Sequence, residues 1–249
     1  MTAKIIDGKA IAKRIREQIK KEIKQIKKRP GLAVVLVGED PASQVYVNMK
    51  EKDSNEIGFY SEKHILPKDT TIGEILCLLQ KLNNNPKIHG ILVQLPLPEN
   101  LDGQLVLESI RWDEDADGFH PINMGNLMLG MPGIVPCTPK GIIELIKSTK
   151  ESLTGKHAVV IGRSNIVGKP VSMLLLAENA TVTICHSKTK NLSKFTKDAD
   201  ILVAAVGRAE MIKGNMIKKG AIVIDVGINR INGKLVGDID FEAAKKVAG

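Results

Sequence analysis

The chain contains few cysteines and few aromatic residues. Its 249 residues include three cysteines, which are Cys77, Cys137 and Cys185. An odd number without Cys-x-x-Cys spacing predicts neither a disulfide framework nor a zinc site, so we expect a reducing cytoplasm and no bound metal. Aromatic residues make up 3% of the chain although its formal net charge is +8. This scarcity argues against a nucleic-acid-binding protein that stacks bases.

Long hydrophobic runs are absent as well. No stretch approaches the roughly 18 apolar residues of a membrane-spanning helix, and the N-terminal residues 1–8 lack an apolar core of signal-peptide length. We therefore expect no membrane partner. Hydrophobic residues still account for 43% of the chain, which is ample for the cores of a two-domain protein.

Much of the positive charge lies in residues 9–29, where isoleucines recur at helical spacing between lysines: Ile11, Ile15, Ile19, Ile23 and Ile26. This pattern is typical of an amphipathic helix with a solvated charged face, which we favour over a nucleic-acid-binding patch. Elsewhere the positive balance suits small anionic ligands.

Short apolar runs alternate with helix-length polar segments along the whole chain. In the first half, this pattern predicts strands over residues 32–37, 60–66 and 88–95, and helices over residues 43–57 and 71–82. In the second half, it predicts strands beginning at His157 and over residues 181–185, 201–206 and 221–225. Such alternation favours parallel sheets with helices on both faces.

A turn-rich stretch from Pro121 to Pro136 separates the two halves. Thr138 and Pro139 then resemble a helix N-cap followed by a proline at the first helical position. We therefore place a domain boundary near residue 138, which gives domains over residues 1–138 and 139–249.

The second half carries part of a dinucleotide-binding fingerprint. Residues 157–170 predict a buried strand, a glycine-framed turn and a helix, in which Gly162 turns the chain and Gly168 allows close helix packing. Backbone N–H groups at the helix start offer a pyrophosphate site. Ser164 replaces the middle glycine of the usual fingerprint. On these residues alone, an ordinary strand-to-helix turn stays open.

A carboxylate is missing where NAD-binding folds usually hold the ribose hydroxyls. The second strand of this half is followed by His186, Ser187 and Lys188 instead of an Asp or Glu. Together with Arg163 in the phosphate turn, these residues favour NADP over NAD, because they suit a 2′-phosphate. Gly207 follows the third strand of this half, where parallel strands deliver residues to a ligand crevice.

Three features of the first half could carry chemistry. Tyr46 and Lys50 lie four residues apart on an expected helix, so the ring could cover a flat substrate while the amine moves protons. A surface pair is the alternative. Gln94 interrupts and ends an apolar strand, either as a functional amide or as a satisfied strand-end amide.

The third feature is the acidic segment 113–118, which begins like a calcium loop. Its twelfth position is Met124, where an EF-hand needs a bidentate Glu, so the segment does not predict a calcium site. From spacing alone, Asp117 and Gly118 form a turn.

Seven sequence blocks occur in the order in which one enzyme family has them. The blocks are Tyr46-Val-Asn-Met-Lys50, Val93-Gln-Leu-Pro-Leu97, Asp117-Gly-Phe-His-Pro-Ile-Asn123, Pro136-Cys-Thr-Pro-Lys-Gly141, Gly162-Arg-Ser-Asn-Ile-Val-Gly-Lys-Pro170, Cys185-His-Ser-Lys-Thr189 and Asp225-Val-Gly-Ile-Asn229. From about Asp7 to its last residues, the chain resembles the bifunctional methylenetetrahydrofolate dehydrogenase/methenyltetrahydrofolate cyclohydrolase family.

The resemblance implies an N-terminal α/β substrate domain, a Rossmann-like parallel-sheet NADP-binding domain, and an active-site cleft between them. NADP+ would take hydride from 5,10-methylenetetrahydrofolate to give the 5,10-methenyl cation, which water opens to 10-formyltetrahydrofolate. The reactions belong to one-carbon metabolism and serve purine biosynthesis. A cytoplasmic homodimer without a nucleic-acid partner is also expected.

The resemblance also implies roles for single residues. Lys50 would be the acid/base of the hydrolytic step, Gln94 would support and tune it, Tyr46 would stack over the folate, and Asp117 would anchor the pterin. The residues expected to bind the cofactor are Gly162, Arg163, Ser164, Gly168, Ser187, Gly207 and Ile228.

One departure concerns the C-terminal end. Family members continue beyond the position of Gly249 through a Pro-Val-Pro-Gly-Gly-Val-Gly-Pro segment and a final helix, which this sequence lacks. Before that point, residues 230–234 predict an Asn-Gly hairpin turn. Two alternatives stay open. One is a folate- and NADP-binding protein whose catalysis is impaired without that segment. The other is a different NADP-dependent two-domain dehydrogenase that acts on a small carbonyl compound.

Overall fold

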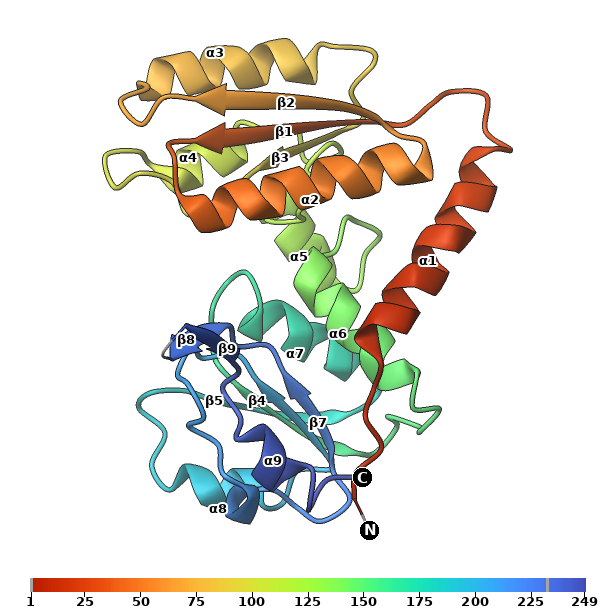
Figure 1. Ribbon diagram of the computed structural model, residues 1–249, viewed down its shortest axis with the longest axis vertical. Helices are drawn as coiled ribbons and strands as arrows, with labels where there is room; N and C mark the ends of the chain where they lie inside the picture. The colour runs from red at the N-terminus through yellow and green to blue at the C-terminus, as the bar shows by residue number, and fades with distance from the viewer. Residues whose placement is uncertain (1, 232) are drawn as a thin grey trace. The chain divides into compact units, whose positions relative to one another are not determined.

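The computed structural model describes residues 2–231 and 233–249. The chain forms two compact units, coloured along the sequence in Figure 1. The first unit comprises Lys9–Ile134. The second comprises Val135–Gly249 together with the N-terminal residues up to Gly8.

The first unit is built on a parallel three-stranded sheet in the order β2-β1-β3. Its strands are β1 (Gly31–Val37), β2 (Tyr60–Leu66) and β3 (Gly90–Val93). The helices are α1 (Gly8–Ile23), α2 (Pro41–Ile57), α3 (Ile72–Asn83), α4 (Gly103–Glu108) and α5 (Pro121–Leu129). As predicted, strands alternate with helices, because short apolar runs form the strands and the longer amphipathic segments between them form the helices.

Helices α2 and α3 cover opposite faces of this sheet (Figure 1). Alternate side chains of a strand point to opposite faces. Val35 therefore packs with Ile75 of α3, while Val34 and Leu36 pack with Val47 of α2. Both faces are buried, which explains why β1 is apolar throughout.

The second unit contains a parallel four-stranded sheet in the order β5-β4-β6-β7. Its strands are β4 (His157–Ile161), β5 (Thr181–Cys185), β6 (Ile201–Ala204) and β7 (Ile222–Asp225), with an antiparallel pair β8 (Asn229–Ile231) and β9 (Lys234–Val236). The remaining elements are α6 (Cys137–Lys147), α7 (Gly168–Ala177), α8 (Leu192–Thr196), η1 (Gly214–Met216) and α9 (Phe241–Ala244).

Two clusters of buried side chains hold this sheet between its helices. Val160 of β4 packs with Ile146 of α6 and Leu175 of α7. On the other face, Ile161 packs with Ala244 of α9. The N-terminal segment joins the same unit, because Ala3 N and Lys4 N donate to carbonyl oxygens of the last five residues at 2.8 and 3.0 Å.

Two predictions around residue 130 are wrong. The stretch from Pro121 to Pro136 contains helix α5, because Pro121 begins the helix and Gly130 ends it with φ 68°. Proline and glycine there mark helix ends and not a continuous turn.

The predicted N-cap at Thr138 is also wrong. Helix α6 begins at Cys137 after an extended Pro136, and it has no side-chain cap. Thr138 and Pro139 lie inside its first turn, where the missing N–H of Pro139 costs no hydrogen bond within the helix.

Smaller differences concern the strands. β3 ends at Val93 and β6 at Ala204, two residues before the predicted ends. β8 and β9 form the predicted hairpin, with Ile231 opposite Lys234; Asn232 of the predicted turn lies outside the described residues. Among the described helices, none is both long enough and apolar enough to cross a membrane.

Candidate functional site

Lys50 and Gln94 come together in the first unit although 44 residues separate them. The Nζ of Lys50, on α2, donates to Gln94 Oε1 at 3.2 Å. Gln94 directly follows β3, and its Nε2 donates to the carbonyl oxygen of Leu95 at 2.7 Å. Because that bond occupies the amide NH2 end, the carbonyl end of Gln94 faces the lysine.

Asp117 supplies a carboxylate to the same cluster. Burial raises the pKa of Asp117 above its ordinary value, the nearby Asp115 adds to this increase, and the charge of Lys50 opposes it. Among the described residues, no N–H or O–H group donates to this carboxylate. Its oxygens are therefore available to the donors of a ligand.

Tyr46 lies one helical turn before Lys50 on α2. Side chains four residues apart project from the same face of a helix. The residue is 44% exposed, so its ring is accessible to a flat ligand. The structure thus brings Lys50, Gln94 and Asp117 together and places Tyr46 on the face that carries Lys50.

Asp115 is a buried carboxylate that the sequence did not single out. It is 1% exposed and accepts hydrogen bonds from Gly118 N at 3.1 Å, His120 N at 2.7 Å and Asn123 Nδ2 at 3.0 Å. These bonds hold the loop that contains Asp117. The Asp-x-x-Gly spacing of a side-chain-capped turn was the available signal.

In the second unit, two glycines shape the turn between β4 and α7. Gly162 has φ 127°, and a Cβ there would overlap the carbonyl of Ala205. A Cβ on Gly168 would overlap the carbonyl of Gly162. Both positions therefore require glycine, as a tight phosphate-binding turn does.

Ser164 caps this turn instead of merely replacing a glycine. Its Oγ accepts from Val167 N at 3.2 Å and from Gly168 N at 3.3 Å. The sequence predicted that N–H groups at the helix start face a pyrophosphate, but the serine hydroxyl occupies these two. An anion at this turn would compete with the hydroxyl for them.

The residues predicted to recognise a 2′-phosphate are exposed after β4 and β5. Arg163 forms no ion pair or hydrogen bond with any described residue. The loop after β5 folds onto itself, since His186 N donates to Thr189 Oγ1 at 2.9 Å and Lys188 N donates to His186 Nδ1 at 3.1 Å. Ser187 and Lys188 are left exposed. These residues fit an NADP phosphate, because the charged and hydroxyl groups are not used elsewhere.

Gly207 and Ile228 follow β6 and β7, at the same end of the sheet. Gly207 has φ 64°, and Ile228 is 66% exposed. Parallel strands place their carboxyl ends along one edge, so the loops after all four strands lie where such sheets bind nucleotides.

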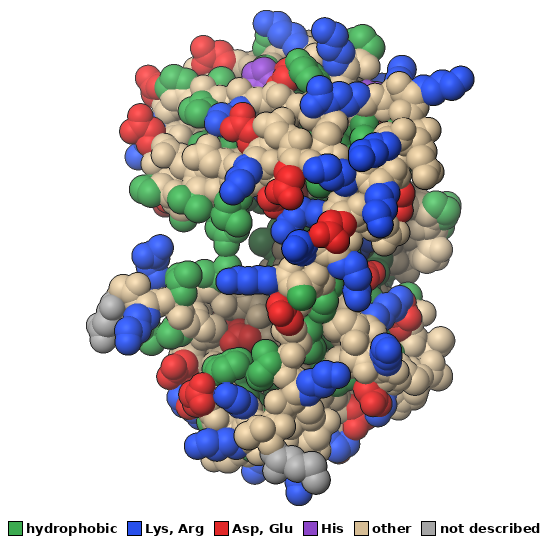
Figure 2. Space-filling view, turned by 45° about the vertical axis from the view of Figure 1, so that its right-hand side comes forward, with side chains coloured by type: hydrophobic (Ala, Val, Ile, Leu, Met, Phe, Trp, Pro, Cys, Tyr) green, Lys and Arg blue, Asp and Glu red, His purple; other side chains and the backbone are tan. Residues whose placement is uncertain are grey.

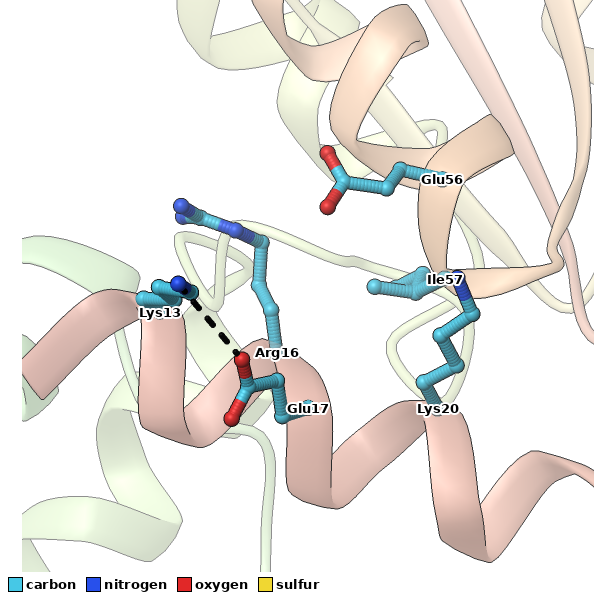
Figure 3. Close-up of a pocket in the computed structure, with 6 residues that line it drawn as sticks. All are labelled: Lys13, Arg16, Glu17, Lys20, Glu56 and Ile57. Atoms are coloured by element: carbon cyan, nitrogen blue, oxygen red, sulfur yellow. Dashed lines mark ion pairs between the residues drawn. The ribbon is translucent and has the colours of Figure 1, made fainter.

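Surface hollows lie away from these residues. One of about 180 Å³ lies between α1 and the end of α2, with charged side chains along its rim (Figure 3). Lys13 and Glu17 in it form an ion pair at 4.0 Å. A second hollow of about 390 Å³ includes Arg29, Tyr60 and His89. Neither contains a predicted site residue, and no group of metal-binding side chains occurs among the described residues.

Fold and site together define a two-unit α/β protein with a nucleotide-binding sheet and a lysine–amide–carboxylate cluster. Residues 6–117 match the family model described as "Tetrahydrofolate dehydrogenase/cyclohydrolase, catalytic domain", and residues 136–249 match that of the "NAD(P)-binding domain" of the same family. The chain belongs to the tetrahydrofolate dehydrogenase/cyclohydrolase family.

Relatives match along the whole chain. The "Bifunctional protein FolD" of Geotalea uraniireducens is 56% identical over 250 residues, which cover 99% of this chain and 89% of the relative. That of Bacillus subtilis is 54% identical over 252 residues, with 100% and 89% covered.

Solved structures agree. The bifunctional FolD methylenetetrahydrofolate dehydrogenase/cyclohydrolase of Campylobacter jejuni has a TM-score of 0.97 at 47% identity, covering 99% of this chain and 89% of that one. The Trypanosoma brucei enzyme, solved with NADP cofactor and an inhibitor, has a TM-score of 0.95 at 36% identity, covering 100% and 89%. The predicted family, fold class and enzyme class are thereby confirmed.

Proposed function

We propose that this chain oxidises 5,10-methylenetetrahydrofolate with NADP+ and hydrolyses the resulting 5,10-methenyltetrahydrofolate to 10-formyltetrahydrofolate. The contact between Lys50 and Gln94 beside Asp117 carries this proposal. All three residues lie within the part of the chain that matches the catalytic-domain family model.

Lys50 moves protons in the hydrolytic step. Water loses a proton as its oxygen bonds to the methenyl carbon. The new hydroxyl then loses its proton as the bond from that carbon to N5 breaks, and N5 takes up a proton, so one proton is released overall. A lysine amine can accept and return these protons. The bond to Gln94 Oε1 holds the lysine nitrogen in a defined position.

Tyr46 and Asp117 bind and orient the folate. The exposed ring of Tyr46 covers the flat pterin by stacking. The Asp117 carboxylate accepts a pair of hydrogen bonds from the amino-pyrimidine edge, and no described side chain competes for its oxygens.

NADP is the cofactor. The second unit belongs to an NAD(P)-binding domain family, and the trypanosomal neighbour was solved with NADP. Gly162, Gly168 and Gly207 give the backbone close access to the cofactor, Ser164 shapes the phosphate turn, and Ile228 offers an apolar contact. Arg163 and Ser187 bind the 2′-phosphate. When bound, NADP+ supplies the hydride acceptor, and the protein's task is to hold it in register with the folate carbon.

One coupled assay tests the proposal. The protein is supplied with methylenetetrahydrofolate and NADP+, and NADPH and methenyl absorbance are recorded together. NADPH formation with transient or sustained methenyltetrahydrofolate is expected. Ligand binding without turnover would instead support a binding protein of impaired catalysis. Activity on a small carbonyl compound alone would indicate a different dehydrogenase.

The same proposal includes a cytoplasmic homodimer that acts on tetrahydrofolate derivatives and a domain boundary near residue 138. Light scattering should give twice the 27.1 kDa of the chain. We propose no nucleic-acid partner, since Lys and Arg side chains are scattered among acidic ones on the face shown in Figure 2. A single-sign basic surface would be expected of a nucleic-acid-binding protein.

A further inference from the structure

Asp238 is a fully buried carboxylate in the second unit, between β9 and α9. Its exposed fraction is 0%. A buried charge is costly unless hydrogen bonds compensate it. Neither the sequence blocks nor the proposed chemistry gives this residue a role.

Four donors converge on Asp238. Three of them are consecutive backbone N–H groups after β6: those of Val206 at 2.6 Å, Gly207 at 3.1 Å and Arg208 at 2.7 Å. The fourth is Asn229 Nδ2 at 3.0 Å, which lies after β7. Consecutive N–H groups that face one anion form a nest, and here the anion comes from the chain itself.

A second carboxylate fixes the position of Asp238. Asp225, the last residue of β7, accepts from the backbone N–H groups of Asp238 at 2.8 Å and Ile239 at 3.0 Å. A Cβ on Gly227 would overlap the Asp238 carboxylate, and one on Gly237 would overlap that of Asp225. Because neither glycine has a side chain, the two carboxylates can lie directly against the backbone.

The loops that Asp238 holds are on one side of the sheet. In the order β5-β4-β6-β7, β5 lies on one side of β4 while β6 and β7 lie on the other. A dinucleotide binds across such a switch point. Arg163 and Ser187 follow β4 and β5, and in the proposed function they bind the half of NADP that carries the 2′-phosphate. The nicotinamide half of NADP would then contact the loops after β6 and β7.

We propose that Asp238 is a positioning residue for the dehydrogenase reaction. It holds the loops after β6 and β7 in the conformation that aligns the nicotinamide with the folate carbon. This inference rests on the proposed function. Without the carboxylate, three neighbouring N–H groups lose their acceptor and the loop refolds to satisfy them. Hydride transfer is sensitive to such shifts, whereas hydrolysis of methenyltetrahydrofolate involves no nicotinamide.

The test compares Asp238→Asn with Asp240→Asn. Asp240 caps α9 by accepting from Ala243 N at 3.1 Å, and Asn caps helices as well as Asp does. Asp238→Asn should lower the dehydrogenase kcat/KM for NADP+ at least about tenfold, with cyclohydrolase activity unchanged. Its affinity for 2′,5′-ADP, which lacks the nicotinamide half, should stay at the wild-type level. Asp240→Asn should alter none of these.

Two outcomes would overturn the inference. One is an unchanged dehydrogenase in Asp238→Asn; the other is an equal loss of NADP+ and 2′,5′-ADP affinity, which would mean a general structural role. If Asp238→Asn does not fold, Asn229→Ala removes a single donor and should weaken the dehydrogenase alone, about threefold, as the loss of one modest hydrogen bond does. No effect of that variant would also reject the inference.

Binding measurements keep this inference separate from the proposed function. If the wild-type chain shows no dehydrogenase activity, the proposed function fails. The ratio of NADP+ to 2′,5′-ADP affinity, measured by calorimetry on wild type and Asp238→Asn, still reports whether Asp238 positions the nicotinamide half.

Discussion

At the scale of single residues, the role proposed for the Lys50–Gln94 pair predicts that the two activities can be separated by mutation. Lys50 donates to Gln94 and lies within electrostatic range of Asp117. Hydrolysis needs a group that takes up and returns protons, whereas hydride transfer formally does not. The two reactions should therefore respond differently to the loss of this amine.

Lys50→Met should abolish cyclohydrolase activity and spare much of the dehydrogenase. A general acid–base group accelerates a reaction by about 10²- to 10⁴-fold, so the rate of hydrolysis should decrease by a factor in that range. The decay of methenyltetrahydrofolate and the formation of NADPH measure the two activities. Lys52→Met, an exposed lysine on the same helix, is the matched control. Unimpaired hydrolysis by folded Lys50→Met would refute the assignment.

Asp117→Asn should stabilise the protein near neutral pH while weakening folate binding. The folded-state pKa of Asp117 lies above its ordinary value of 3.8. Between 3.8 and the raised value, the folded state therefore binds more protons than the unfolded state. Stability then decreases as the pH rises from about 3.8 through the raised value. The variant lacks this decrease in stability.

Thermal unfolding across pH measures the effect of Asp117→Asn. The variant should melt above the wild type at pH 7, and the difference should disappear at the acid end, where the wild-type carboxyl is protonated. A variant that melts below the wild type at pH 7 would contradict the sign of the shift.

Arg163→Ala should narrow the preference for NADP+ over NAD+. The Arg163 guanidinium is exposed and makes no ion pair or hydrogen bond with a described residue. A charge-assisted hydrogen bond contributes about 1.5 to 3 kcal/mol, so NADP+ affinity should fall about 10- to 100-fold. NAD+ affinity serves as the internal control and should change little. Equal specificity constants for the two cofactors in the wild type would reject this prediction.

Single residues also show where sequence reasoning stops. The resemblance assigned Lys50, Gln94 and Asp117, but only the folded chain shows the contact between Lys50 and Gln94. Asp115 and Asp238 were not singled out. A buried carboxylate is recognised by the backbone N–H groups that surround it, and these come from segments up to 32 residues away in the chain.

At the scale of elements, periodicity predicted most helices and strands. β2 has the predicted bounds, and α3 differs by one residue at each end. The missed helix α5 is short and begins at Pro121, so it offered too few turns for a periodic signal. The start of α6 was misplaced because Pro136 is extended and ends the preceding loop.

The turn between β4 and α7 yields a prediction at this scale. Gly168→Ala should abolish tight NADP+ binding, because the new Cβ overlaps the Gly162 carbonyl and displaces the phosphate turn. Calorimetric titration with NADP+ measures the loss. A Cβ added at Gly141 in α6 would meet no atom within 4 Å apart from its chain neighbours and the backbone of its own helix. Gly141→Ala should therefore leave NADP+ binding intact and stabilise the helix by about 1 kcal/mol. Equal NADP+ affinity of both variants would disprove the role of Gly168.

At the scale of the whole molecule, each unit has its own buried cluster. Ala33, Ile75 and Ile91 belong to the first, and Val160 and Leu175 belong to the second. Each sheet is covered by helices of its own unit. Ligands that bind one unit should therefore stabilise that unit directly.

Hydrogen exchange should detect this division. NADP+ at about 100 times its Kd stabilises the bound form by about 2.7 kcal/mol, so amides of β4, β6 and β7 should exchange more slowly with the cofactor present. Amides of β1 and β3 in the first unit should change less. Equal protection of both sheets by NADP+ would contradict independent cores.

The hydrogen bonds of Ala3 and Lys4 to the last residues have a consequence for synthesis on the ribosome. The first unit is one continuous segment and can fold as soon as Ile134 has emerged. The second cannot close until residues 245–249 follow, roughly ten seconds later at typical elongation rates. During that interval Ala3 and Lys4 lack their hydrogen-bond acceptors, because the residues that supply them have not yet been synthesised.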